Sequence, residues 1–186
     1  MMIQISRPVR RLLLPVAIAA LLASCSTKAS ECRKLSQSVN EIRPIADQIQ
    51  QEGKKFEAAA KDAGVKNDLP AFKTAAADSA KAFDGLIGQL SGLISKIQDT
   101  SLKDETLVGI KDRYVQNATA INQSFQATSQ ALTTISKIES SPKGLQELKQ
   151  AANSLTQTAT KMNTLVQEES KLITEFSTYC EVDQKQ

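Results

Sequence analysis

The chain contains no histidine and no tryptophan, and only 4% of its residues are aromatic. Without histidine, Ser-His-Asp and Cys-His catalysis are excluded, as is the Glu-x-x-His metal motif of ferritin-like bundles. The Cys-x-x-Cys-His haem attachment motif is also missing, and no glycine-rich phosphate loop joins a strand to a helix. We therefore predict that the protein is not an enzyme and holds no metal or cofactor.

The sequence also lacks the alternating apolar and polar pattern of β-strands. Instead, apolar residues recur at steps of three and four, which is typical of amphipathic helices. Four such stripes cover residues 32–60, 72–97, 107–138 and 145–180. Because the helices are similar in length and their connections short, we predict an all-α, antiparallel up-down-up-down four-helix bundle. An alternative is a pair of longer coiled coils that dimerise through the same stripes.

Proline, glycine and short polar residues predict where these helices bend, start and stop. Pro44 lies inside the first stripe and should kink that helix. Gly64 suits the left-handed position after a helix end, where Val65 would fold back on the last turn. Asp68 is expected to cap the second helix. Ser101, with acidic residues three and four positions later at Asp104 and Glu105, resembles the capping box of the third helix.

Glycine is scarce overall, with seven in the chain, yet three lie in the segment of residues 84–94. Each costs about 1 kcal/mol of helix propensity relative to alanine. The segment could bind a membrane or a partner. A close helix–helix contact or a flexible point is the favoured interpretation, because the apolar stripe continues through it.

The N-terminal region has the three parts of a secretory signal. Basic residues Arg7, Arg10 and Arg11 precede an apolar run over residues 12–22, and small residues then lead to Cys25. The apolar run is shorter than the roughly 20 residues that span a bilayer, which argues against an uncleaved membrane helix. The sequence Leu22-Ala23-Ser24-Cys25 closely resembles the lipobox of bacterial lipoproteins.

This resemblance implies cleavage before Cys25, a thioether-linked diacylglycerol on its sulfur, and acylation of its amine by a fatty acid such as palmitate. The lipid bilayer would then be a partner of the protein, in the cell envelope. Ser26 stands where aspartate would retain such a protein at the inner membrane, which favours the outer membrane. The predicted organisation is a signal peptide at 1–24, a lipidated tether at 25–30, the bundle at 31–182 and a polar tail at 183–186. In outline, the bundle is similar to small helical lipoproteins of the photosystem II lumen and of the bacterial envelope.

Removing the signal changes the charge balance. Its three arginines belong to the 23 basic residues of the chain, and it contains no acid, so the remaining part has 20 basic and 20 acidic residues. A net charge of zero gives no electrostatic basis for binding nucleic acid, and none is expected.

Of the three cysteines, Cys32 and Cys180 remain after lipidation of Cys25. Export places them in an oxidising compartment, where a pair of cysteines usually forms a disulfide. In an antiparallel four-helix bundle, the start of the first helix and the end of the fourth lie at the same end. We therefore predict a Cys32–Cys180 disulfide.

Glu169 falls on the apolar stripe of the fourth helix. Counting residues from the disulfide end places Arg43 and Arg113 at the same level of the bundle, beside Pro44 and Tyr114. We predict a polar layer in which one arginine neutralises Glu169 and Tyr114 donates a further hydrogen bond. The alternative is a rotated helix that leaves Glu169 half-exposed, because unpaired charges are rarely buried.

These observations predict a monomeric envelope lipoprotein with a non-catalytic helical domain that binds or spaces an unidentified envelope protein. The alternative function is that of a small-ligand sensor or carrier with a pocket between the helices. A continuously packed core would favour the first function. A cavity of a few hundred Å³, lined by apolar and a few polar groups, would favour the second.

Overall fold

The structure is a computed structural model that describes the backbone of residues 14–181 and the side chains of residues 27–181. The basic residues of the predicted signal and the predicted tail at 183–186 lie outside the described residues. Cys25 lies inside a helix, with its side chain outside the described part.

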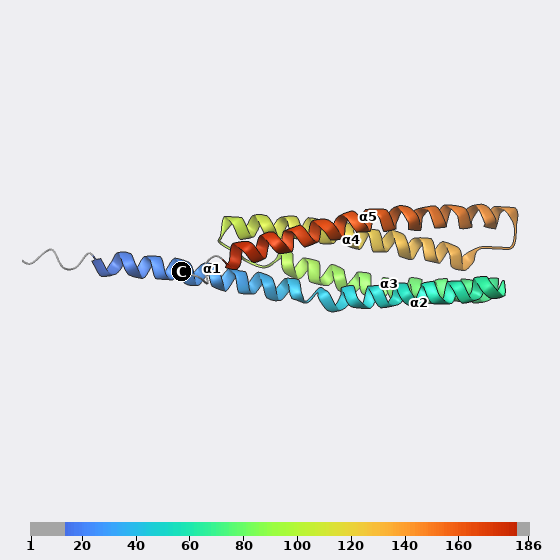
Figure 1. Ribbon diagram of the computed structural model, residues 1–186, viewed down its shortest axis with the longest axis horizontal. Helices are drawn as coiled ribbons and strands as arrows, with labels where there is room; N and C mark the ends of the chain where they lie inside the picture. Colours follow the sequence, from blue (N-terminus) through green and yellow to red (C-terminus); the bar gives the residue numbers. More distant parts are fainter. Residues whose placement is uncertain (1–13, 182–186) are drawn as a thin grey trace, which may run out of the picture.

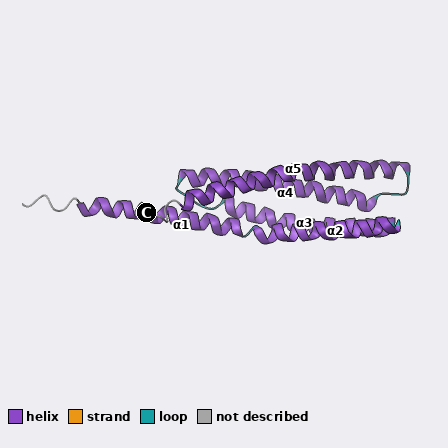
Figure 2. Cartoon of the chain, in the orientation of Figure 1, coloured by secondary structure: helices purple, strands orange, loops and turns teal. Residues whose placement is uncertain are grey.

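Within the described residues, the chain forms five helices and no strand (Figures 1 and 2). They are α1 (Leu14–Asn40), α2 (Arg43–Lys66), α3 (Leu69–Gln98), α4 (Glu105–Lys137) and α5 (Pro142–Glu181). The first two follow one another along one leg of the bundle, so the molecule has four antiparallel legs (Figure 1). The predicted all-α helical bundle is confirmed.

The first leg is interrupted where a kink was predicted. Residues 41–42 form a turn in which the Ile42 N–H donates to the Val39 carbonyl at 3.1 Å. Pro44 has no N–H, and its ring would collide with the carbonyl of Asn40, four residues earlier, in a continuous helix. The chain therefore ends α1 and starts α2 with proline in the first turn, where a missing N–H costs nothing.

The predicted end of this leg is wrong by one helical turn. Asn67, not Gly64, takes the left-handed conformation, with φ 52°, and its N–H faces the carbonyls of the last turn. Asparagine tolerates this region better than most residues, so the helix runs through Gly64 to Lys66. Val65 is 77% exposed and does not fold back on the helix.

The starts of α3 and α4 each depend on an aspartate. Asp68 caps α3 as predicted, accepting a hydrogen bond from the Ala71 N–H at 2.9 Å. Asp104 caps α4 through the Leu107 N–H at 3.0 Å. The predicted capping box at Ser101 is wrong, because residues 101–104 are not helical and Asp104 lies nearer the first turn.

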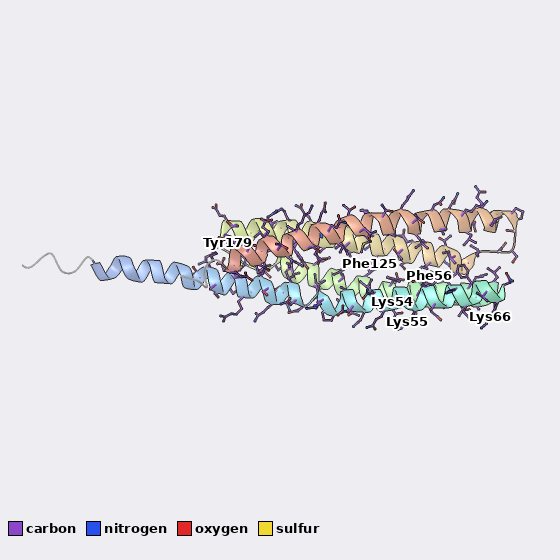
Figure 3. All side chains as sticks on the ribbon, viewed as in Figure 1. Lys54, Lys55, Phe56, Lys66, Phe125 and Tyr179 are labelled. Carbon is purple, nitrogen blue, oxygen red and sulfur yellow. A yellow bond between two sulfur atoms is a disulfide. The ribbon has the colours of Figure 1, made fainter. Side chains whose placement is uncertain are left out.

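The α2 helix packs mainly on α3. The rings of Phe56 and Phe72 lie 6.3 Å apart between these helices. Lysines 54, 55 and 66 are exposed on α2 (Figure 3). The α5 helix packs mainly on α4, whereas α2 and α5 barely approach each other. Toward the end far from the disulfide, α4 lies between α5 and the α2–α3 pair (Figure 1), so the seam between the first and fourth legs is open.

The inward face of α5 differs from the predicted stripe along one flank. Within the apolar stripe expected at residues 145–180, the large apolar residues Leu145, Val166 and Ile173 are 55%, 48% and 45% exposed. Their N-terminal neighbours Gly144, Leu165 and Leu172 are buried instead. Because α5 packs on α4 and not on α2, only one of its two apolar flanks is covered.

The glycine-rich segment does not mark a close helix–helix contact. A Cβ atom added to any of the three glycines at 85, 88 and 92 would meet nothing within 4 Å, and all three lie on the exposed side of α3. The interpretation of a close contact is therefore wrong. These glycines leave space that larger residues could fill.

Candidate functional site

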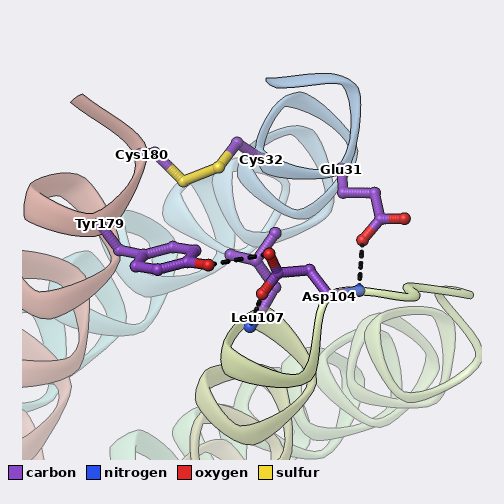
Figure 4. The surroundings of a disulfide bond; sticks show 6 residues. All are labelled: Glu31, Cys32, Asp104, Leu107, Tyr179 and Cys180. Carbon is purple, nitrogen blue, oxygen red and sulfur yellow. Dashed lines mark hydrogen bonds between the residues drawn. A yellow bond between two sulfur atoms is a disulfide. The ribbon is translucent and has the colours of Figure 1, made fainter. Parts of the chain in front are cut away.

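The disulfide end of the bundle is held by a covalent bond. The sulfur atoms of Cys32 and Cys180 are bonded, with Cα atoms 6.0 Å apart and 148 residues between them in sequence. The bond joins α1 to the last turn of α5 (Figure 4). The predicted pairing is present, for the topological reason that predicted it.

A hydrogen-bond network surrounds this disulfide. Glu31, 8% exposed, accepts the N–H groups of Lys103 and Asp104 at 3.0 and 2.9 Å. The Tyr179 hydroxyl donates to the other side of the junction, reaching Asp104 Oδ2 at 2.8 Å (Figure 4). Lys28 Nζ lies 3.9 Å from the centroid of the Tyr179 ring, which is a cation–π distance. The network joins α1, α4 and α5 at one end.

The pKa of Asp104 reports this network. Its partial burial opposes the charged form, but hydrogen bonds from the Leu107 N–H, the Tyr179 hydroxyl and the Thr106 N–H, with the charge of Lys28, outweigh it. The pKa of Asp104 therefore lies below its ordinary value. The carboxylate stays charged at the helix N-terminus, where negative charge is favourable.

The segment predicted as a tether, residues 25–30, lies within α1. Cys25 precedes Cys32 by seven residues on the same helix, a rise of about 10 Å at 1.5 Å per residue. None of the described helices combines the length and apolar character needed to cross a membrane. The segment next to Cys25 is thus a direct helical extension of the bundle.

The predicted polar layer is present in part. The Tyr114 hydroxyl donates to Glu169 Oε1 at 3.1 Å. Burial of the hydroxyl, followed by the nearby carboxylate charge and their hydrogen bond, raises the pKa of Tyr114 well above its ordinary value. Glu169 itself is partly buried.

The predicted arginine partners of Glu169 are wrong. Arg113 pairs with Glu175 at 2.5 Å, and this bond raises the pKa of Arg113 and lowers that of Glu175. Arg43 is exposed on α2 and forms no ion pair with any described residue. Glu175 is six residues beyond Glu169, roughly one and two-thirds helical turns, and lies at the surface, where Arg113 reaches it without burying a charge.

The open seam between α2 and α5 contains a cleft of about 380 Å³. Its walls come from residues 42–50 at the start of α2, residues 162–169 of α5 and the facing parts of α3 and α4. The lining residues are mostly apolar: Ile42, Ile45, Ala46, Ile49, Leu90, Ala118, Ile121, Phe125, Met162 and Val166. Three polar residues join them, namely Asp47, Gln50 and Glu169.

The sequence pattern pointed to Glu169 but not to the rest of this cleft. Asp47 and Gln50 are ordinary polar positions on the amphipathic α2 and carry no motif. The sequence does indicate that α5 has apolar residues on two neighbouring faces, since Leu165 and Val166 are both large and apolar. A helix with two apolar flanks needs either two neighbours or a ligand.

Two buried asparagines on α4 were not predicted from the sequence. Asn117 donates to the Leu165 carbonyl at 3.1 Å and Asn122 donates to Ser91 Oγ at 2.8 Å. Both side-chain carbonyls lack a partner among the described residues. These bonds link α4 to α5 and to α3, and they set the register of the legs.

The chain matches no protein-family model, no curated protein and no solved structure. No group of histidine, cysteine or acidic side chains among the described residues could hold a metal ion. The functional interpretation therefore depends on the residues and geometry above.

Proposed function

We propose that this protein is a lipid-anchored cell-envelope lipoprotein whose helical domain is a non-catalytic binding rod. The observation that carries the proposal is the lipobox-like sequence Leu22-Ala23-Ser24-Cys25 behind a basic and apolar leader. Acyl chains on Cys25 would supply about 0.8 kcal/mol per buried CH₂, enough for stable anchoring without a membrane-spanning helix.

The cross-linked end supports this proposal. Cys25 is on the helix that carries Cys32, so a force on the lipid anchor passes through α1 and the disulfide into α5. The 40 residues of α5 correspond to a length of about 60 Å. A rod of this kind would hold its free end, and any envelope protein bound there, away from the bilayer. Ser26 favours the outer membrane.

The experiment compares wild type with Cys25→Ser in a bacterial host given radiolabelled palmitate. We expect wild type to incorporate label and sediment with membranes, and Cys25→Ser to lose the label and appear as soluble protein or full-length precursor. Ser26→Asp is the matched control, which should stay labelled and move to the inner membrane. A Cys25→Ser variant with the same N-terminus and membrane fraction as wild type would overturn the proposal.

A second candidate function is that of a small-ligand carrier or sensor. It is favoured by the cleft, because a volume of about 380 Å³ falls within the range of small-molecule sites. A spacer needs no such cavity. In this function, the anchor positions the cleft at the membrane and the ligand occupies the seam between α2 and α5.

A further inference from the structure

The cleft between α2 and α5 combines an apolar lining with charge of one sign. Among the described residues, Asp47 and Glu169 are the only charged ones that line it, and no described lysine or arginine does so. Phe125 adds an aromatic ring, a group whose face attracts cations. A site of this composition favours a positively charged, largely apolar molecule.

The two carboxylates have no basic partner in the described part of the chain. Asp47 forms no ion pair or side-chain hydrogen bond there, and Glu169 uses only Oε1, which accepts the Tyr114 hydroxyl. Arg113, the arginine beside Tyr114, is engaged by Glu175. The Tyr114 bond orients the Glu169 carboxylate, and its second oxygen accepts no hydrogen bond from the described residues.

The size of the cleft selects the class of occupant. Its α2 wall runs from Ile42 to Gln50, about 13 Å of helix. A stable protein interface buries about 800 Å² on each partner, which needs a larger surface than this. A volume of about 380 Å³ lies toward the lower end for small-molecule sites and leaves no room for two acyl chains.

We propose that this cleft binds a water-soluble amphiphilic organic cation, with its apolar body against the aliphatic walls and its cationic head at Asp47 and Glu169. This inference rests on the second candidate function, that of a ligand carrier, and names the class of ligand.

Met162 offers a direct probe, because it lines the cleft and is the only methionine in residues 14–181. The full chain, labelled with [methyl-¹³C]methionine and held in lipid nanodiscs, is titrated with 4-phenylbutylamine, 4-phenylbutan-1-ol and 4-phenylbutyrate. These probes share a ring and chain and differ in charge. Met162→Leu assigns the signal, and empty nanodiscs correct for partitioning into lipid.

We expect the amine to shift the Met162 signal with the highest affinity and the carboxylate with the lowest. A partly exposed ion pair contributes up to about 1 kcal/mol, so Asp47→Asn and Glu169→Gln should each weaken amine binding by up to roughly fivefold. Binding of the alcohol should not change. Glu168→Gln is the matched control, since Glu168 is exposed and lies outside the lining.

The outcomes test the cationic ligand class and the carrier function separately. Equal affinities for all three probes would overturn the cationic ligand class and leave the carrier function standing. No Met162 shift with any probe would overturn both. A shift that depends on protein concentration alone would show that a second copy covers the cleft, which also overturns the inference.

Discussion

Removal of the Cys32–Cys180 disulfide tests the topology of the bundle most directly. The bond closes a loop of 148 residues, nearly the whole described chain. In the chain-entropy model, such a loop lowers the entropy of the unfolded state enough to stabilise the fold by about 5 kcal/mol. Domains of this size are stable by about 5–15 kcal/mol in total, so the bond supplies a large share.

The noncovalent contacts at the same end limit the structural damage. In Cys32→Ala/Cys180→Ala, the hydrogen bonds of Glu31 and Tyr179 remain available. The variant should therefore keep its helical circular dichroism at 25 °C. Because α1 packs only lightly on its neighbours, its amides should lose hydrogen-exchange protection first.

The assay is equilibrium urea unfolding of the full chain. We expect the double alanine variant to lose about 2–5 kcal/mol of unfolding free energy, since the model value is often not fully realised. Its m-value should rise, because an unfolded chain without a cross-link exposes more surface. Reduced wild type is the control and should match the variant. Coincident midpoints for the variant and oxidised wild type would refute the argument.

Three further predictions concern stability in urea. Tyr114→Phe leaves the Glu169 carboxylate without its hydrogen-bond donor and should lower the free energy of unfolding by about 1.5 kcal/mol. Because the pKa of Tyr114 is raised in the folded state, wild type should lose stability as pH rises above about 10. The variant should lose less. Asp104→Ala should lower the free energy of unfolding by about 1 kcal/mol at neutral pH. Because the pKa of Asp104 is lowered in the folded state, the difference in stability between variant and wild type should shrink as pH falls below about 4. A difference that stays constant with pH would contradict the role of Asp104 as a cap. Gly88→Ala fills open space on the exposed side of α3 and should raise the free energy of unfolding by up to about 1 kcal/mol. Gly144→Ala places a Cβ against the backbone of residue 139 and should lower it. Equal effects of the two substitutions would show that the packing argument is wrong.

The sequence by itself determined the helical class, the number of legs and the disulfide. These depend on local pattern and on topology: the apolar period, the short connections and the fact that the ends of an antiparallel four-leg bundle coincide. The cap at Asp68 follows from the same local chemistry, since its side chain accepts an N–H three residues later. Such features depend on neighbours in sequence, so a single chain carries enough information to predict them.

Only the tertiary structure decided which flank of α5 is buried. Leu148, Leu155 and Phe176 lie on the expected stripe and pack against the core, but Leu165 is buried in place of Val166 and Leu172 in place of Ile173. Leu165 and Val166 are both apolar, so periodicity fits either choice. The packing of α5 on α4 and away from α2 settles it, burying Leu165 and opening the cleft beside Val166.

The partner of Glu169 was decided in the same way. Counting residues places Arg113 and Tyr114 at the correct level but does not say which of two neighbouring side chains faces inward. Adjacent residues on a helix point about 100° apart, so Tyr114 turns into the bundle while Arg113 turns out to Glu175. Local pattern sets the helices and their ends, whereas the rotation of each helix about its axis is a property of the packed molecule.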